Sequence, residues 1–404
     1  MFIRQWIGVI ASLVPLAGCP GSRPEESGGP PLAAGSESAE PRFRKAGTTL
    51  RLYVAPEGSD NSPGTAAAPL RTVQKAADLV RPGDTVIVRP GVYTGPSRIV
   101  SLERSGTSDA WITFRSEIKG DAVLDGRKGL SLEAWYFGPG VGHVRVEGFQ
   151  IRDLGAHGFD FYGGGVHDIV ISGNHVHHIG RNCTDTSNGR TGASLGAGAH
   201  RVTLDGNIWH DIGRYAPGER GCSPRTRHYQ NHDHGIYVSD ADEITIKNNV
   251  FHAFGRGWAI HRYSSDGLPS HGLLILNNTF DGPNSYRPGQ IILATSTTGA
   301  RIENNIFHRP NTAAIYFEAR RFRGGSVRNN MVHGGVMKVG RPAGVTFLRN
   351  WEGTDPRFVS RTDFRLRSDS PAIDSALPLA EVTRDADGVV RPRGDGYDLG
   401  AYER

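Results

Sequence analysis

Six segments between residues 168 and 350 repeat one pattern and decide the fold. They read IVISGNHVHHIGR (169–181), VTLDGNIWHDIGR (202–214), ITIKNNVFHAFGR (244–256), LLILNNTFDGP (273–283), ARIENNIFHRP (300–310) and GSVRNNMVHGG (325–335). In each segment apolar and polar residues alternate up to an asparagine, and one apolar position and usually a histidine follow. The asparagines are 33, 42, 29, 27 and 25 residues apart. Because short strands recur without a helical period, the pattern predicts an all-β fold, a single-stranded parallel β-solenoid.

Equivalent residues of a solenoid stack from coil to coil, so the repeat predicts ladders. The first is a ladder of hydrogen-bonded asparagine amides, at Asn174, Asn207, Asn249, Asn278, Asn305 and Asn330. The second contains histidines and one aspartate, at His177, His210, His252, Asp281, His308 and His333. Its repetition favours a structural ladder over a metal or catalytic site, because chemistry needs one site. A third column, Arg181, Arg214 and Arg256, fits either anion binding or a solvated turn.

The composition agrees with one long solenoid. Glycine accounts for 54 of the 404 residues, as many tight turns require. The apolar content excludes a disordered or collagen-like chain. Lys and Arg number 46 against 41 Asp and Glu, with no long basic run, so charge does not indicate nucleic-acid binding. The small basic excess fits either a polyanionic partner or an ordinary solvated surface.

Residues 1–18 have the features of a signal peptide, since Arg4 precedes a short apolar stretch that ends at Leu16. Leu16-Ala17-Gly18-Cys19 resembles the bacterial lipobox, which implies a lipidated Cys19 as the mature first residue. Residues 19–48 predict a flexible tether. We expect an exported protein, lipid-anchored at the periplasmic or cell-surface side of the bacterial envelope, that touches the membrane only through this anchor. An ordinary secretory signal with an incidental cysteine is the alternative.

A further strand follows a variable loop in each coil. These strands are GFDFY (158–162), GASLG (192–196), GIYVS (235–239), AIHRY (259–263), QIILA (290–294) and AIYFE (314–318). The variable loops therefore lie at one corner of the solenoid. Cys183 and Cys222 fall in the loops of adjacent coils. Because export permits disulfides, we predict that these cysteines pair and pin the loops.

From about Arg51 to Arg404 the chain resembles the right-handed parallel β-helix proteins of the pectate-lyase-like group. The opening LYVAPEGSDNSPGTAAAPLRTVQKAADLVRPGDTVIVRPGVY (52–93) includes TVQKAADLV (72–80), which caps the open core in that group. The tail, FRLRSDSPAID (364–374) and DADGVVRPRGDGYDLGAYE (385–403), resembles the terminal segment of exported bacterial members. The resemblance implies a right-handed β-helix over residues 49–350, an N-terminal capping helix and a C-terminal capping segment over residues 351–404. We expect a monomer.

The resemblance also implies a cleft along the strands that follow the variable loops. Outward positions there are rich in tyrosine and histidine in the middle coils. The candidate catalytic residues are His232, His234, Tyr237 and His261. The candidate substrate-binding residues are Asp160, Arg214, Arg256, Trp258, Arg262 and Tyr263. Strict alternation turns His234 and Arg262 inward, so a buried structural role is the alternative for both.

These residue types favour a polysaccharide lyase that cleaves an acidic, uronic-acid-containing glycan by β-elimination. A neutral histidine, either His261 or His232, would act as the base, and Tyr237 would protonate the leaving oxygen. Some lyases of the group use lysine and calcium, but Lys247 is the only lysine between residues 129 and 337 and lies away from the cleft. We therefore expect no metal and no other cofactor, with a divalent cation such as calcium as the alternative.

Three other functions stay open. A uronan C5-epimerase would share the proton abstraction. A glycoside hydrolase normally needs two carboxylates roughly 5–10 Å apart, whereas Asp160 and Glu318 lie on coils far from each other. A non-catalytic glycan-binding surface protein would need only the ladders and the aromatic side chains.

Overall fold

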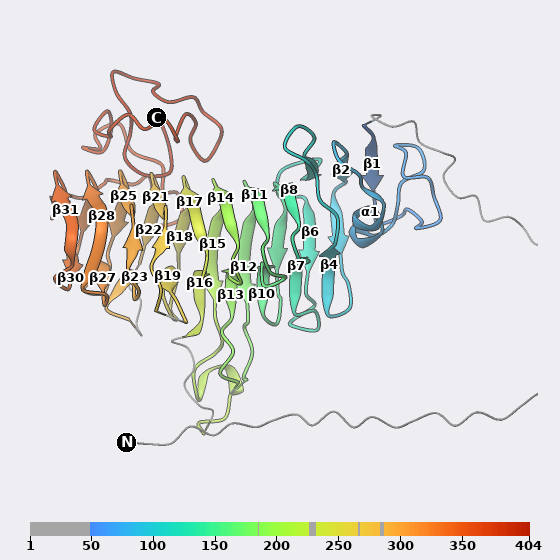
Figure 1. Ribbon diagram of the computed structural model, residues 1–404, viewed down its shortest axis with the longest axis horizontal. Helices are drawn as coiled ribbons and strands as arrows, with labels where there is room; N and C mark the ends of the chain where they lie inside the picture. The colour runs from blue at the N-terminus through green and yellow to red at the C-terminus, as the bar shows by residue number, and fades with distance from the viewer. Residues whose placement is uncertain (1–48, 185, 226–231, 266, 283–286) are drawn as a thin grey trace, which may run out of the picture. The chain divides into compact units, whose positions relative to one another are not determined.

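The computed structural model describes residues 49–404 apart from 185, 226–231, 266 and 283–286. The chain winds into a stack of coils, each of which adds strands to three parallel sheets (Figure 1). The predicted all-β, single-stranded right-handed parallel β-helix is thereby confirmed. The predictions for residues 1–48, including lipidation of Cys19, lie outside the described residues. In the described part of the chain, no helix is long and apolar enough to cross a membrane.

The strands of each sheet follow the chain at regular intervals. The first sheet contains β1 (Arg51–Val54), β2 (Thr85–Val88), β5 (Ile112–Ser116), β8 (Gly142–Glu147), β11 (His167–Ser172), β14 (His200–Asp205), β17 (Asp242–Lys247), β20 (Ser270–His271), β21 (Leu274–Leu276), β24 (Thr297–Thr298), β25 (Arg301–Glu303), β28 (Arg321–Arg328) and β31 (Ala343–Leu348). The second contains β3 (Gly91–Tyr93), β6 (Ala122–Asp125), β9 (Gln150–Arg152), β12 (His175–Ile179), β15 (Ile208–Ile212), β18 (Val250–His252), β22 (Thr279–Asp281), β26 (Ile306–His308), β29 (Met331–His333) and β32 (Trp351–Glu352). The third contains β4 (Arg98–Leu102), β7 (Glu133–Phe137), β10 (His157–Asp160), β13 (Thr191–Leu195), β16 (His234–Ser239), β19 (Ile260–Tyr263), β23 (Gly289–Leu293), β27 (Ala313–Phe317) and β30 (Val336–Val339).

The predicted asparagine ladder forms at the turn between the first and second sheets. From Asn174 to Asn330 each Nδ2 donates to the Oδ1 of the next asparagine at 2.9 or 3.0 Å, and Asn330 extends the ladder to Asn350. The residue before each asparagine has a left-handed backbone, with φ of 63° at Gly173 and 54° at Asn248. Glycine and asparagine tolerate this conformation best, which explains the GN and NN pairs of the repeat.

Inside the coils, equivalent apolar side chains stack as the ladders do. The rings of Trp209, Phe251, Phe280 and Phe307 lie parallel, with centroids 6.3, 4.7 and 4.8 Å apart. All four side chains are buried. Such stacking adds to the free energy of burying large apolar groups, so the core fixes the register between coils.

Two segments outside the sheets pack on the stack, one at its first coils and one along the side of its later coils. The helix α1 (Val73–Leu79) begins after Thr72, whose hydroxyl accepts the Lys75 N–H, and it buries Val73 and Ala76 on the core as predicted. Near the other end, an irregular segment after β32 lies over the strands of the later coils (Figure 1). This segment is hydrogen-bonded to the coils of the β-helix. The Asn277 side-chain amide donates to the Asp398 carbonyl, and the Lys247 ammonium donates to the Glu381 carbonyl.

Candidate active site

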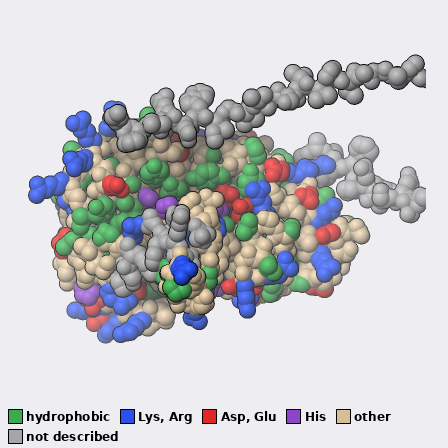
Figure 2. Space-filling view, turned by 90° about the horizontal axis from the view of Figure 1, so that it is seen from below, with side chains coloured by type: hydrophobic (Ala, Val, Ile, Leu, Met, Phe, Trp, Pro, Cys, Tyr) green, Lys and Arg blue, Asp and Glu red, His purple; other side chains and the backbone are tan. Residues whose placement is uncertain are grey.

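A groove of about 1000 Å³ runs along the third sheet, on the face where the variable loops project. Paired strands bring outward side chains into one row, in the order Asp160, Ser194, Tyr237, His261, Ile292 and Tyr316. Figure 2 views this face and shows histidine side chains at the surface beside the projecting loops. Among the predicted residues, those that line the groove are Asp160, His232, His234, Tyr237, Trp258, His261 and Tyr263.

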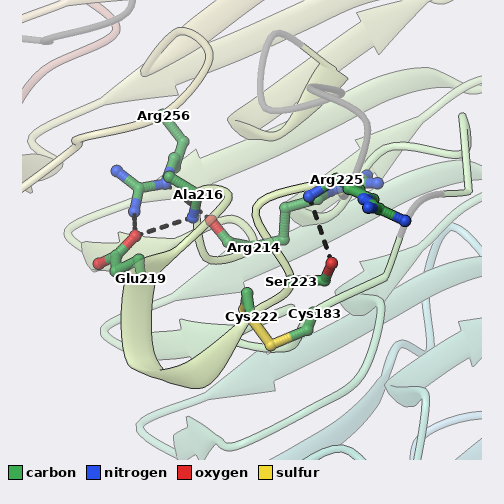
Figure 3. The surroundings of a disulfide bond; sticks show 8 residues. All are labelled: Cys183, Arg214, Ala216, Glu219, Cys222, Ser223, Arg225 and Arg256. Carbon is green, nitrogen blue, oxygen red and sulfur yellow. Dashed lines mark hydrogen bonds and ion pairs between the residues drawn. A yellow bond between two sulfur atoms is a disulfide. The ribbon is translucent and has the colours of Figure 1, made fainter.

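The two longest variable loops are joined as predicted. Cys183 and Cys222 form a disulfide with their Cα atoms 5.3 Å apart (Figure 3). Cys222 follows a short 3-10 turn, η1 (Glu219–Gly221), and Glu219 pairs with Arg256 beside it. The bond therefore ties the loop before β13 to the loop before β16, which together flank the groove.

Arg214 has a different role from the predicted contact with substrate. Its side chain is fully buried, and its guanidinium lies 2.7 Å from the Asp233 carboxylate, which is also fully buried. The same guanidinium donates to the carbonyls of Thr186 and Asn188 at 2.5 and 2.6 Å. Asp233 accepts the Arg190 backbone N–H as well. This ion pair thus holds both groove loops and fixes the chain between His232 and His234.

Arg256 and Arg262 also need correction as substrate-binding candidates. Arg256 is 9% exposed, pairs with Glu219 and donates to the Arg214 carbonyl at 2.7 Å. Arg262 is 1% exposed and donates to the Ser270 hydroxyl at 2.6 Å. Arg256 thus lies inside the loop framework, whereas Arg262 belongs to β19 and turns toward the interior of its coil. For Arg262 this is the buried role that strand alternation indicated.

A close backbone approach places His234 at the floor of the groove. Gly257 has a φ of +23°, and a Cβ atom there would lie 1.6 Å from the Asp233 carbonyl oxygen. Only glycine allows this contact, which brings the following backbone N–H, that of Trp258, to 3.0 Å from His234 Nδ1. The backbone therefore sets the orientation of the His234 ring.

A chain of hydrogen bonds leads from the Trp258 backbone N–H through His234 to His261, and each group donates to the next. Burial, and after it the charges of His261 and Arg287, hold the pKa of His234 well below its ordinary value, so this ring is neutral. Because the Trp258 N–H donates to Nδ1, the His234 proton lies on Nε2. Nε2 is 2.9 Å from Nδ1 of His261 and donates to it.

His261 consequently carries its own proton on Nε2. Burial and the nearby Arg287 lower the pKa of His261 to about 3, so the ring is neutral at ordinary pH. With Nδ1 occupied by the bond from His234, Nε2–H is the polar group that His261 presents outside this pair. In this state His261 is a hydrogen-bond donor rather than a base.

His232 has the opposite polarity. Its Nδ1 lies 2.7 Å from the Ser187 carbonyl oxygen, which can only accept, so Nδ1 carries the proton. The neutral ring therefore has Nε2 as its proton-accepting nitrogen. His232 is exposed and lies at the groove. The groove thus combines one accepting and one donating imidazole.

Tyr237 lies beside the rings of His234 and His261. Its ring centroid is 5.4 Å from that of His234 and 5.2 Å from that of His261. Burial is the main reason that the pKa of Tyr237 rises to about 12. The phenol therefore keeps its proton and can donate it to a group in the groove.

Two titratable residues of the groove, Arg287 and His157, were not predicted from the sequence. Arg287 lines the groove, and its Nε has no hydrogen-bond partner among the described residues. His157 begins β10 and lies 2.8 Å from the Thr191 hydroxyl through its Nδ1. Arg287 stands just before a strand of the third sheet, in the same place in its coil as the stretch that supplies His232. Position in the coil could have pointed to Arg287, whereas nothing in the repeat distinguishes His157.

A pair of carboxylates lies toward the N-terminal end of the same sheet. Glu133 on β7 and Asp160 on β10 stand on adjacent coils. The pKa of Glu133 is raised by burial first and by the charge of Asp160 second, although Arg98 donates to it at 2.8 Å. Burial also raises the pKa of Asp160. The sequence prediction considered Asp160 and Glu318, which lie on distant coils, and overlooked Glu133.

Two models of known protein families match parts of the chain. Residues 52–247 match a family model described as Pel9A-like, right handed beta helix region. The chain is a right-handed parallel β-helix protein. A second model, described as periplasmic copper-binding protein (NosD), matches residues 209–340. The predicted resemblance to the pectate-lyase-like group is confirmed.

Curated relatives match only parts of the chain. Pectate lyase PEL9 of Emericella nidulans is 36% identical over 77 residues, which is 19% of this chain and 18% of that protein. The uncharacterized protein YwoF of Bacillus subtilis is 30% identical over 139 residues, or 32% of this chain and 29% of that protein. The matched segments therefore span less than a third of either relative.

Solved structures agree over a larger part of the coil stack. The crystal structure of pectate lyase Pel9A is 17% identical, with a TM-score of 0.51 over 88% of this chain and 96% of that one. A structure described as a glycoside hydrolase is 11% identical, with a TM-score of 0.52 over 75% of this chain and 96% of that one. At these identities the likeness concerns the fold, and function depends on the groove.

Proposed function

We propose that the protein is a polysaccharide lyase that cleaves an acidic, uronic-acid-containing glycan in the groove by β-elimination. The observation that carries this proposal is the opposite polarity of two imidazoles in one groove, His232 accepting and His261 donating. A carbon–acid elimination needs a base, a proton donor for the leaving oxygen and neutralisation of the uronate carboxylate. The groove offers a separate group for each task.

The first task is to weaken the bond from hydrogen to the carbon next to the carboxylate. Arg287 and the Nε2–H of His261 are the groups suited to bind that carboxylate. Their positive charge and hydrogen bond would stabilise the negative charge that develops as the proton leaves. Arg287 fits the task because it lines the groove and its Nε lacks a partner within the described residues.

The second and third tasks belong to His232 and Tyr237. Nε2 of His232 would take the carbon-bound proton, the electron pair would form the carbon–carbon double bond, and the bond to the leaving glycosidic oxygen would break. The Tyr237 hydroxyl, protonated because burial raises its pKa to about 12, would give its proton to that oxygen. This division assigns the base to His232, so His261 and His234 act as donor and positioning residue.

Three alternative functions fit the same structure. A uronan C5-epimerase would use the same proton abstraction and reprotonate the carbon from the other face. A glycoside hydrolase is favoured by the adjacent carboxylates Glu133 and Asp160, whose raised pKa values suit a proton donor. A non-catalytic glycan-binding protein would use the same aromatic groove without turnover.

The proposed surroundings follow the same chemistry. The substrate would be an acidic polysaccharide, and the disulfide supports a location outside the cytoplasm. We further propose anchoring through the lipid on Cys19 and action as a monomer without a required cofactor.

An assay of the purified protein on a panel of uronic-acid polymers tests the proposal. A lyase produces an unsaturated uronate, which absorbs in the ultraviolet, whereas a hydrolase releases reducing ends without that absorbance. We expect the wild-type protein to form the ultraviolet-absorbing product from at least one polyuronate. The variant His232→Ala, in which Asp160 is unchanged, should not form it. Reducing ends without unsaturation, abolished by Asp160→Asn, would instead identify the hydrolase, and binding without any product would leave a glycan-binding protein.

A further inference from the structure

A second cluster of histidines lies outside the groove, on the outer face of the second sheet. The rings of His177 and His210 stack with centroids 4.9 Å apart and an angle of 1° between their planes. His252 stacks on His210 at 4.5 Å, and His175 lies 4.9 Å from His210. Stacking alone explains the ladder His177, His210 and His252. It does not explain His175 and His178, which lie beside the ladder and bring further ring nitrogens to the same place.

A local distortion turns consecutive side chains to the same side. His178 has a φ of 55° and Asp211, its counterpart on the next coil, has a φ of 50°. A left-handed residue within a strand breaks the alternation, so His178 joins His177 outside, and Asp211 joins His210. On the following coil this position is Ala253, which ends the cluster. On the preceding coil this position is Asp153, with a φ of 57°, so His178 and Asp211 are the pair of this column that adjoins the stacked rings of His177 and His210.

Three of these side chains have the geometry of a metal ligand set. Ligand atoms of His178, His210 and Asp211 all lie within 4.8 Å of one another, and none of the three is fully buried. Ligands at about 2.0–2.2 Å from one tetrahedral ion lie closer together than this, so small side-chain movements would suffice. Two imidazoles and one carboxylate suit a borderline divalent ion such as Zn²⁺ or Cu²⁺ better than Ca²⁺ or Mg²⁺.

The neighbouring histidines supply the outer hydrogen bonds that metal-bound imidazoles normally make. Nε2 of His210 lies 2.7 Å from Nε2 of His175, which leaves Nδ1 of His210 toward Asp211, also at 2.7 Å. Nδ1 of His178 lies 2.7 Å from Nδ1 of His177, which leaves Nε2 of His178 for an ion. An ion would replace the proton that His210 shares with Asp211.

Two further groups of similar composition are less suited to an ion. In the group His143, His167 and Asp168, the carboxylate already receives two hydrogen bonds from Arg201 at 2.9 and 2.7 Å. In the group around His308, Nδ1 of that ring is held at 2.6 Å by Asp281. A guanidinium or a carboxylate thus competes with the ion in both places.

We propose that His178, His210 and Asp211 form a binding site for a divalent transition-metal ion, with His175 and His177 as positioning residues and one coordination position open to water. This site is independent of the proposed lyase activity, since it lies on another sheet. It would give the repeated histidine ladder a local function at one pair of coils.

The test uses the full chain stripped of metal with a chelator and then titrated with Cu²⁺ and Zn²⁺ by equilibrium dialysis. Electron paramagnetic resonance of the tightest Cu²⁺ equivalent should show coupling to two imidazole nitrogens. His178→Ala should remove one of them and weaken binding more than about 10-fold, and the positioning variant His177→Phe should weaken it by about 10- to 100-fold. His271→Ala, a matched change at a histidine whose side chain is 65% exposed, should leave binding intact.

Thermal unfolding of each variant separates loss of ligands from loss of fold, and His178 is the safer position because its side chain lies outside the core. An unchanged Cu²⁺ spectrum in both His178→Ala and His210→Ala would overturn the proposal. Loss of the tightest equivalent in His143→Ala instead would also overturn it, since the ion would then occupy the other group.

Discussion

The histidines of the second sheet and those of the groove differ in what determines their neighbours. On the second sheet His177, His210 and His252 meet because the repeat stacks equivalent positions. In the groove, His234 meets the Trp258 backbone and His232 meets the Ser187 carbonyl, contacts that only the variable loops create. Repetition thus produces a surface of like groups, whereas departure from repetition gives each ring a fixed direction of proton donation.

The largest expected effect comes from removing the accepting imidazole. His232→Ala should lower kcat/KM on the cleaved polyuronate by about 10²–10⁴-fold, the usual range for a general base. His333→Ala, in the ladder of the second sheet, should keep the wild-type rate because that ring lies away from the groove. Initial rates of both variants measure the difference. Equal rates in the two variants would mean that groove and ladder histidines do not differ in function.

The buried ion pair under the groove should have the next largest effect. Arg214→Met leaves the fully buried Asp233 without its partner, so the free energy of unfolding should fall by about 3–5 kcal/mol. Arg201→Met removes a guanidinium that is 49% exposed in its pair with Asp168, and should cost about 0–1 kcal/mol. Urea unfolding of both variants provides the comparison. A cost as small for Arg214 as for Arg201 would contradict the role of Arg214 in holding the loops.

Much of the contrast between the ladder of the second sheet and the groove could be predicted from the sequence. The repeat located the asparagine ladder and the outward row that contains Tyr237 and His261, since strands impose a period of two. It also located the loops joined by Cys183 and Cys222. The contacts of Arg214 could not be predicted, because they depend on how irregular loops fold back over the coil. Glu133 and Arg287 were missed for a related reason, since Glu133 is the first residue of β7 and Arg287 lies just before β23, where alternation does not assign a side.

A smaller effect should separate donation from acceptance at His261. His261→Phe removes the Nε2–H and should lower kcat/KM by about 10- to 100-fold, equivalent to one hydrogen bond to a charged group. In His261→Gln the side-chain amide can still donate a hydrogen bond, so this variant should recover part of the loss. If His261 were the base, glutamine would not restore activity, because an amide does not accept the proton. Steady-state rates of the two variants decide the matter. If glutamine is no better than phenylalanine, donation by His261 is not what matters.

The smallest expected effect concerns stability and pH. Unfolded histidine titrates near pH ~6.5, whereas burial lowers the pKa of His261 to about 3 in the folded protein. Between these values the unfolded chain binds a proton that the folded chain does not, so the free energy of unfolding decreases as the pH falls through this window. Urea unfolding at about pH 7 and about pH 5 should show a smaller decrease for His261→Gln than for the wild type. An equal decrease would mean that His261 is not held neutral by the fold.

Nitrogen-15 NMR of the protein labelled at histidine tests most directly the claim that the loops give the groove rings opposite polarity. Multiple-bond proton–nitrogen correlations distinguish the two neutral tautomers, and the variants His232→Ala and His261→Gln assign the signals. We predict that His232 carries its proton on Nδ1 and His261 on Nε2 near neutral pH. The reverse pair, with an unprotonated Nε2 on His261, would contradict the account and make His261 the base.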